Sequence, residues 1–381
     1  MDENRKIMLL SVLVVVMFGA MLLPKVSPRQ WRTAMPYLRW AVVGVGALGV
    51  GAVGVVVARK VVGDLKQSAT NKAVADGPTV FLRRPKEAPP VNLEKTTIWK
   101  RLAYAQPTTE HVSFEVGGNA DRQFIAVHAS ETKLRAVSRE LLQEWSDIQR
   151  RPAEPKDEPT LVPPGWWVYW VEVGPSSADR PIVCSSRDPL MAVLSEVADT
   201  ASPTRGLLQV ITHSDFSTRR RLGQKSAELR GGPTQNAGAR YQITKEAKEL
   251  EARGAELFLE TVVRVSAISP DPERAKGTAV ALGNTLCNQF GPSNPVVVQR
   301  QARAPYRPDA GRQAGLDLSA RSIESKARRS WADSELVALA HVPGGDALKA
   351  APLLSVGSAK ELPAKPEARI RDMELARFKE R

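Results

Sequence analysis

Cysteine is nearly absent from this chain, because only Cys184 and Cys287 occur among its 381 residues. Two cysteines cannot build a disulfide framework, so cysteine usage does not argue for an oxidising compartment. Histidine is also scarce, and none of the four histidines has a second His or Cys at metal-ligand spacing. Cys287 falls in a segment predicted to be helical, where a small buried hydrophobic residue is the ordinary interpretation.

The motifs of common catalytic centres are missing as well. The chain has no G-x-x-x-x-G-K-[ST] loop; residues 223–226 (GQKS) lack both the glycine before the lysine and the upstream glycine. It also has no G-x-S-x-G nucleophile motif. We therefore predict that the protein is not an enzyme and has no catalytic residue, cofactor or metal site of its own.

Two long uncharged apolar runs, residues 7–23 and 40–58, are present near the start of the chain. A helix needs roughly 20 apolar residues, and about 17 at least, to cross the hydrocarbon core of a bilayer. We therefore interpret residues 1–63 as a transmembrane hairpin in the lipid bilayer. A cleaved signal peptide is the less favoured alternative, because residues 22–25 (LLPK) offer no small-residue cleavage site.

The second apolar run carries small residues at 3-4-3-4 spacing, which places them along one face of a helix. Such a face lets transmembrane helices approach closely. Its members are Gly44, Ala47, Gly51, Gly54 and Ala58. Gly44, Gly46 and Gly49 also spell G-x-G-x-x-G, but that dinucleotide motif has meaning only between a strand and a helix, so we favour transmembrane packing.

Basic residues flank the two apolar runs, four in the connecting loop and six on the outer flanks. Because Lys and Arg are enriched on the cytoplasmic side, this asymmetry favours a multi-pass protein of the inner (cytoplasmic) membrane with its soluble body in the cytoplasm. The net charge of +13 favours anionic partners, either nucleic acid or anionic lipid. Membrane topology accounts for many of these charges.

The rest of the chain divides by composition. Residues 64–97 contain four prolines and few large apolar residues and are predicted to be a linker; residues 98–304 have globular composition; residues 305–381 are predicted to be a partly ordered basic tail. Alternating apolar residues predict strands at 111–117, 123–128, 166–173, 206–213, 256–267 and 295–301. Helical spacing predicts helices at 131–148, 188–201, 218–230, 245–254 and 271–290.

These elements predict an α+β fold, a mainly antiparallel sheet with helices on one face, and each half is a candidate ferredoxin-like subdomain. Residues 231–240 break the chain with Gly, Pro and Asn, and mark either a subdivision or an exposed excursion. In the strand at 256–267, the alternation places Glu260, Arg264 and Ser266 on a wet face.

Bulky apolar residues occupy both faces of the strand at 166–173 (WWVYWVEV). One interpretation is a central strand buried on both sides, and the other is an aromatic platform for stacking bases. We favour the buried strand, because no Lys or Arg lies between Gly165 and Ser177 to meet phosphates.

The densest basic cluster outside the membrane flanks lies on the helix predicted at 218–230. A solvated helix face is the ordinary interpretation, and contact with phosphate or an acidic protein is the alternative. The candidate contact residues are Arg219, Arg220, Arg221, Lys225 and Arg230, together with the later pair Arg328 and Arg329.

The order of several blocks resembles the amino-terminal portion of membrane-anchored conjugative-transfer ATPases of type IV secretion systems, the coupling-protein class. After the hairpin and linker, these blocks include "IWKRLAYAQPTTEHVSFEVGGNADRQFIAVHA", "PPGWWVYWVEV", "RDPLMAVLSEVAD", "RGLLQVITHSD" and "WADSELVALAHVPGG". In that class this portion anchors and assembles the machine, and a P-loop motor follows. This sequence reaches Arg381 without a motor motif, so the family's ATPase residues have no counterparts in it.

The resemblance implies a non-motor assembly or adaptor subunit of a DNA-transfer machine. Its expected partners are a separate P-loop ATPase and other secretion-machine subunits, with DNA and a second copy of the chain as further candidates. A stand-alone membrane-tethered nucleic-acid-binding protein is the alternative from another class. A truncated gene product without a role of its own is the third.

Overall fold

A computed structural model of the chain describes residues 74–85, 88–104, 110–184, 188–232, 237–302, 308–323 and 325–344. The chain separates into two compact units, Met1–Ala69 and Thr70–Arg381, and all described residues belong to the second. The predicted transmembrane hairpin and its small-residue face lie outside the described residues. Within the described part, no helix has the length and apolar character needed to span a membrane.

The first half of the described chain follows the order β-α-β-β-α-β. Its elements are β1 (Thr79–Arg83), α3 (Ile98–Tyr104), β2 (Val112–Gly118), β3 (Gln123–Ala129), α4 (Glu131–Glu144) and β4 (Gln149–Pro152). In the sheet these strands lie in the order β4-β1-β3-β2. Numbered within the half, the spatial order is 4-1-3-2.

The second half repeats this plan, with a helical hairpin inserted between its middle strands. Its elements are β5 (Trp167–Pro175), α5 (Pro189–Asp199), β6 (Arg205–Asp215), α6 (Ser217–Gly231), α7 (Ala237–Gly254), β7 (Phe258–Ser269), α8 (Pro272–Cys287) and β8 (Val296–Gln301). The strands lie in the order β6-β7-β5-β8, again the β-α-β-β-α-β connectivity. The two halves therefore share one topology.

The halves join through their second strands, because β2 pairs antiparallel with residues 206–212 of β6. From this junction the strands follow the same order in both directions: second, third, first, fourth. All recorded strand pairs are antiparallel, including the short β9 (Arg329–Ala332), which pairs with the start of β7. The predicted α+β class with an antiparallel sheet is confirmed.

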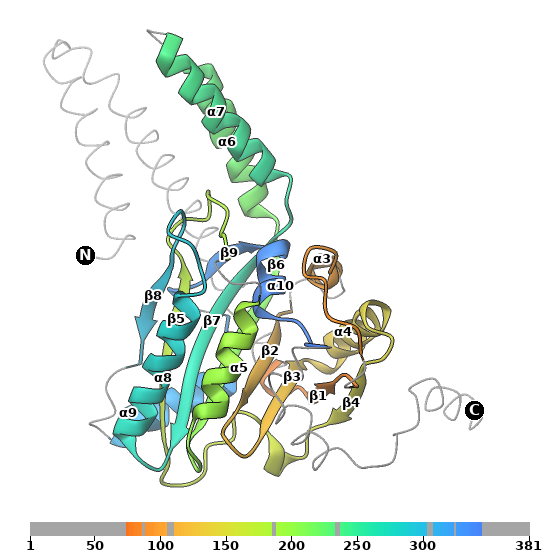
Figure 1. The fold of residues 1–381 in the computed structure, drawn as a ribbon, viewed down its shortest axis with the longest axis vertical. Helices are drawn as coiled ribbons and strands as arrows, with labels where there is room; N and C mark the ends of the chain where they lie inside the picture. Colours follow the sequence, from red (N-terminus) through yellow and green to blue (C-terminus); the bar gives the residue numbers. More distant parts are fainter. Residues whose placement is uncertain are drawn as a thin grey trace, which may run out of the picture. The chain divides into compact units, whose positions relative to one another are not determined.

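Helices α3, α4, α5 and α8 and the late helix α10 (Asp333–Leu339) cover one face of the sheet, and α5 and α8 lie side by side on it (Figure 1). Helix α9 (Pro308–Ala320) lies on the other face. Val168 and Val171 of β5 point to opposite faces of the sheet, because successive side chains of a strand alternate. A Cβ on Gly283 of α8 would meet Val171, whereas a Cβ on Gly315 of α9 would meet Val168, so the two helices lie on opposite faces. The expectation of helices on one face only is therefore incomplete.

Short side chains at the helix starts explain where three of these helices begin. Ser130 caps α4 by accepting a hydrogen bond from the backbone N–H of Lys133, and Asp188 caps α5 in the same way. Asp271 caps α8 by accepting from the N–H of Glu273. In α5 and α8 a proline follows the cap, where its missing N–H and its fixed φ cost nothing.

The strand β5 is buried on both faces, as we favoured. Val168, Tyr169 and Trp170 are each at most 3 % exposed, so the aromatic platform for bases is ruled out at this strand. The wet face expected along β7 is wrong in part, because Arg264 and Ser266 are buried while Glu260 keeps partial exposure.

Two segments assigned outside the globular body belong to it. Residues 79–83, expected in the linker, form β1, which pairs with β3 and β4 inside the sheet. Residues 308–344, expected in the tail, supply α9, β9 and α10, and Trp331 and Leu336 are fully buried. Both segments are short apolar stretches among prolines or charges, and they are buried by strands far away in the chain.

Candidate functional site

The α6–α7 hairpin extends beyond the sheet (Figure 1), and most of its described side chains are exposed. It replaces a tight turn between β6 and β7, whose last paired residues are Asp215 and Phe258. Leu222 and Leu250 are buried in the seam between the helices, and Ser226 Oγ donates to the carbonyl oxygen of Ala247 at 3.0 Å. Residues 231–240, where the sequence suggested a subdivision or an excursion, lie between the two helices or within their ends.

The base of the hairpin is anchored to the end of the sheet by Asp215. Its Oδ1 accepts from the backbone N–H groups of Ser217 and Thr218 at 2.8 and 3.1 Å, and its Oδ2 accepts from Ser330 Oγ at 2.6 Å. Burial raises the pKa of Asp215, but these hydrogen bonds outweigh burial and hold the pKa below its usual value. The start of α6 is therefore fixed by a carboxylate that bridges β6 and β9.

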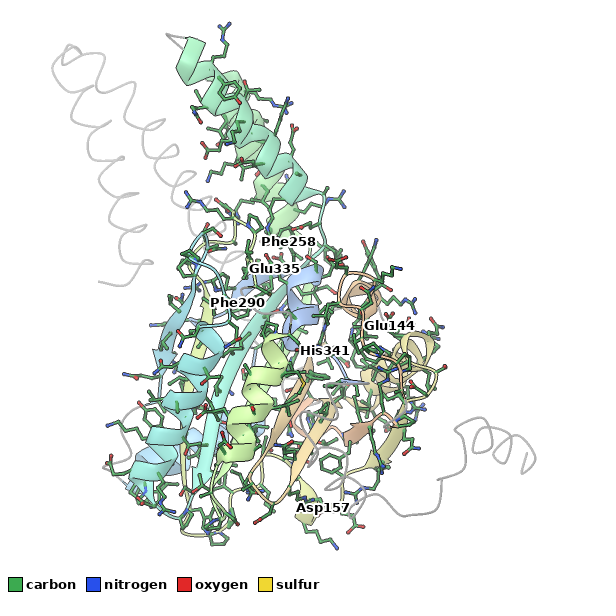
Figure 2. The ribbon with its side chains drawn as sticks, in the orientation of Figure 1. Glu144, Asp157, Phe258, Phe290, Glu335 and His341 are labelled. Atoms are coloured by element: carbon green, nitrogen blue, oxygen red, sulfur yellow. The ribbon has the colours of Figure 1, made fainter. Side chains whose placement is uncertain are left out.

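The other end of the hairpin is anchored by a buried ion pair. Arg253 and Glu335 approach to 2.7 Å with side chains 3 % and 5 % exposed, and the Arg253 guanidinium lies 4.8 Å from the Phe258 ring centroid. Glu335 also accepts from the backbone N–H of Ala332 at 2.7 Å. Figure 2 shows Phe258 and Glu335 close together at this base. Burial is the main cause that raises the pKa of Glu335, although Arg253 opposes it.

Of the seven basic candidates from the sequence, three on the hairpin are bound to carboxylates of the chain itself. Arg221 and Lys225 both contact Asp179, each at 2.7 Å. Arg230 pairs with Glu251. These charges are largely neutralised within the fold, which weakens their case as contacts for an external anion.

The later pair of candidates lies near the sheet edge and is also engaged. Arg328 contacts Glu260 at 3.4 Å, and Arg329 donates to Gln299 Oε1 at 2.8 Å. The next residue, Ser330, lies 2.7 Å from the Thr218 hydroxyl of α6, so the pair lies near the base of this helix with both guanidinium groups already engaged.

Arg219 and Arg220 are different, because both are exposed and no ion pair is recorded for either within the described part of the chain. They follow Phe216, the N-cap residue of α6, which stands three and four residues earlier and is 61 % exposed. Sequence reasoning missed Phe216. The available signal was its spacing, since an aromatic residue at i with arginines at i+3 and i+4 falls on one face.

A second polar group is buried on the α9 face of the sheet, and the sequence did not predict it. Cross-strand register places Glu115, Gln209, Arg264, Glu172 and Arg300 in one row across β2, β6, β7, β5 and β8. Glu172 and Arg264 approach to 2.7 Å with side chains 0 % and 3 % exposed. Removal of a single partner from such a pair is strongly destabilising.

The end of α9 and the residues after it lie over this row and supply hydrogen-bond and ion-pair partners to its polar side chains. Arg321 Nε donates to Glu115 Oε1 at 2.6 Å, and its guanidinium also contacts Glu158. Arg264 donates to the Asp317 carbonyl at 2.7 Å, and Ser325 donates to Glu172 at 2.5 Å. Burial raises the pKa of Glu115, but Arg321 outweighs burial and lowers it. These buried ion pairs and hydrogen bonds hold the segment after α9 against the sheet.

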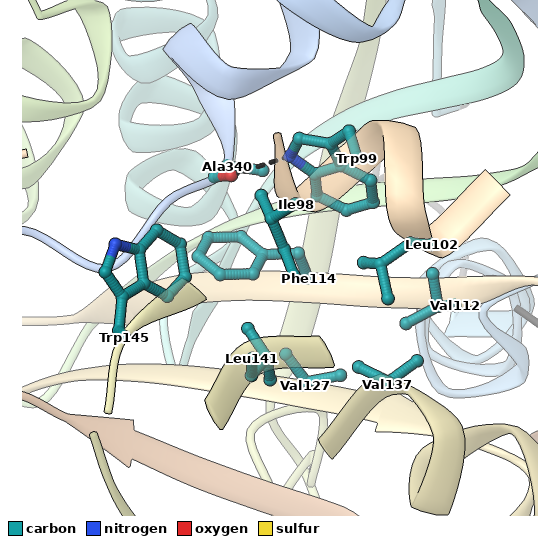
Figure 3. Close-up of a pocket in the computed structure, with 10 residues that line it drawn as sticks. All are labelled: Ile98, Trp99, Leu102, Val112, Phe114, Val127, Val137, Leu141, Trp145 and Ala340. Carbon is teal, nitrogen blue, oxygen red and sulfur yellow. Dashed lines mark hydrogen bonds between the residues drawn. The ribbon is translucent and has the colours of Figure 1, made fainter. Parts of the chain in front are cut away.

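A small apolar cavity lies between α3, α4 and the first half of the sheet (Figure 3). Its volume is about 10 Å³, and its lining includes Trp99, Phe114 and Trp145. Trp99 Nε1 donates to the Ala340 carbonyl at 2.7 Å beside it. A space of this size holds about one water molecule and is far below the few hundred Å³ of a ligand pocket. Across the described ranges, no group of three or more metal-ligating side chains is found.

No protein-family model matches this chain, and no curated protein matches it. The functional argument therefore rests on the geometry of the described body and on the blocks quoted in the sequence. Of the two polar groups, the row across the sheet is buried apart from Arg300, whereas the α6–α7 hairpin presents Arg219 and Arg220 to solvent.

Proposed function

We propose that this protein is a membrane-anchored, non-catalytic assembly or adaptor subunit of a conjugative DNA-transfer (type IV secretion) machine that works with a separate P-loop ATPase. In this proposal residues 1–63 form the transmembrane hairpin and the body faces the cytoplasm. The two β-α-β-β-α-β halves are ferredoxin-like subdomains that form one platform. The α6–α7 hairpin is the arm that contacts other subunits.

The observation that carries the proposal is the exposure of the outer part of this arm. Between Ser226 and Ala247, the described side chains are exposed, apart from the half-buried Leu229 and Ile243. Helices gain most of their stability from burying an apolar face, and these outer turns bury little within the chain. A partner that packs against them supplies the missing burial, which suits a subunit whose task is assembly.

The test is recovery of partners from native membranes. The tagged full chain is crosslinked in membranes and purified in mild detergent, and the accompanying proteins are identified by mass spectrometry. The matched variant replaces residues 227–246 with a short Gly-Ser loop. It keeps the Ser226–Ala247 contact and the anchors Leu222, Leu250 and Arg253, so the body is expected to stay folded.

We expect the full chain to recover a P-loop ATPase and other channel subunits, and the shortened variant to lose them while its thermal unfolding stays within a few degrees. Recovery of nucleic acid without any motor protein contradicts the proposal. That result favours the stand-alone membrane-tethered nucleic-acid-binding protein, for which the exposure of Arg219 and Arg220 is the supporting observation. A steep loss of nucleic-acid binding as salt rises is its further signature.

A further inference from the structure

We propose that the base of α6 is a contact site for single-stranded nucleic acid, formed by Phe216, Arg219 and Arg220. The inference rests on the proposed DNA-transfer role and names what one surface of the arm contacts. It assigns the contact to three residues at the base and leaves the outer turns of the hairpin to protein partners.

The three side chains are exposed at the start of α6, where Phe216 is the N-cap residue and Arg219 and Arg220 lie in the first turn. Phe216, Arg219 and Arg220 stand at positions i, i+3 and i+4, and the buried Thr218, Leu222 and Ser226 mark the side of α6 that faces the seam. Arg220 lies opposite that side, and Arg219 flanks it. In a helix, residues three and four apart are neighbours on the surface. The ring and the two guanidinium groups therefore form one continuous exposed patch.

Beyond the two arginines the next residues on this face have small side chains. Gly223 and Ala227 follow at one-turn intervals, and a Cβ placed on Gly223 would meet no atom within 4 Å. Glycine inside a helix is unfavourable by roughly 1 kcal/mol relative to alanine. An extended strand is thus able to pass Gly223 and Ala227 without meeting a bulky side chain, and Arg230 is the next large side chain on this face.

The patch matches the chemistry of single-stranded nucleic acid. Bases stack on exposed aromatic rings irrespective of sequence, and arginines bind the phosphates between them. The neighbouring Arg221 and Lys225 both contact Asp179, so the negative charge of this carboxylate is balanced within the chain. An acidic protein is less suited, because a protein interface needs an apolar core and this face offers a single ring.

The test measures binding of a fluorescein-labelled oligothymidine by the full chain in detergent, using fluorescence anisotropy over a series of salt concentrations. We expect R219Q/R220Q to weaken binding by about tenfold or more and to lower the slope of log K against log salt by about 1.4, since each single-strand phosphate contact contributes about 0.7. We expect F216A to weaken binding by about tenfold through lost stacking, with the salt slope unchanged.

The matched control is K245Q/K248Q, which removes two exposed lysines from α7 of the same hairpin. It is expected to keep affinity within about twofold. A control that loses as much affinity as R219Q/R220Q overturns the proposal in favour of diffuse attraction, and absence of oligothymidine binding by the parent chain overturns it outright.

The same variants are carried through the native-membrane recovery. If R219Q/R220Q binds oligothymidine normally but recovers fewer partner subunits, the patch docks a protein and the proposal is overturned. If oligothymidine binding fails while the full chain still recovers the ATPase, the inference is wrong and the proposed function stands. The two failures are thus distinguishable.

Discussion

Arg321 donates a hydrogen bond from Nε to Oε1 of Glu115 at 2.6 Å, although the two residues lie 206 positions apart. Both side chains are buried, at 3 % and 0 % exposure. The bond fixes the segment after α9 to β2 in the first half of the sheet. A stretch that composition assigned to a partly ordered tail is therefore held by a buried charge.

Replacement of Arg321 by methionine is expected to lower the free energy of unfolding by about 3–5 kcal/mol, because it leaves the buried Glu115 carboxylate without its partner. The double variant E115M/R321M is expected to lose less than R321M alone, since neither charge of this pair is left buried without the other. Urea unfolding followed by tryptophan fluorescence measures both. A loss below about 1 kcal/mol for R321M contradicts this role for the pair.

Stability is also expected to fall in mild acid because of His111. Burial lowers the pKa of His111 from 6.5 to about 4, helped by the nearby His213 and opposed by the backbone carbonyl of Arg321, which favours the protonated ring. The pKa of His111 is lower in the folded protein than in the unfolded chain. Its contribution to the free energy of unfolding is therefore complete above pH 6.5 and is lost as the pH falls toward 4. The free energy of unfolding is expected to fall by about 3 kcal/mol over this range, since each unit of pKa difference corresponds to about 1.36 kcal/mol.

The measurement is the free energy of unfolding at several pH values for the parent chain and for H111F, which fills a similar volume without a titrating group. We expect the variant to show a shallower decline between pH 6.5 and 4. Equal slopes for the two proteins in this window show that His111 is not the cause.

Two glycines are expected to respond to alanine in opposite directions. Gly118 has φ +134°, and a Cβ there would lie 1.9 Å from the Arg122 carbonyl oxygen, so G118A is expected to cost more than about 2 kcal/mol. Gly277 lies inside α8 with open space around it, so G277A is expected to stabilise by about 0.5–1 kcal/mol. Thermal unfolding of both variants measures these two effects. If G277A is destabilised, the space around Gly277 is not open.

Residues 1–63 are predicted to hold the protein in the membrane. The parent chain is expected to stay in the pellet after carbonate extraction, and a variant lacking residues 1–63 is expected to move to the supernatant, because only the hairpin runs supply about 20 apolar residues each. Extraction followed by immunoblotting measures this. A parent chain released by carbonate contradicts the transmembrane interpretation.

Local patterns predicted most secondary structure of the body. Strands such as β2, β3 and β6 follow from period-2 alternation, and α5 follows from its apolar spacing after the Asp188 cap. The prediction missed short strands, among them β1 and β9, and also the 13-residue helix α9, which was assigned to the tail. The five residues of β1 and the four of β9 depend on partners in β3 and β7 for their hydrogen bonds.

The functional residues divide in the same way. The sequence identified the basic cluster on α6, but it gave all five cations the same weight. Only the fold shows that Asp179, some forty residues away, takes Arg221 and Lys225 and leaves Arg219 and Arg220 exposed beside Phe216. Charge is a property of composition, whereas its availability depends on which carboxylate lies nearby.

The sequence alone determined the α+β class, the positions of most strands and helices, and the two apolar runs, because hydrophobic periodicity acts over a few residues. The tertiary structure alone decided that the two halves join through β2 and β6, and that a polar row crosses the sheet. It also decided that Arg264, expected on a wet face, is buried against Glu172. A charged side chain is buried only where a distant partner compensates for its lost hydration, and chain folding alone supplies that partner.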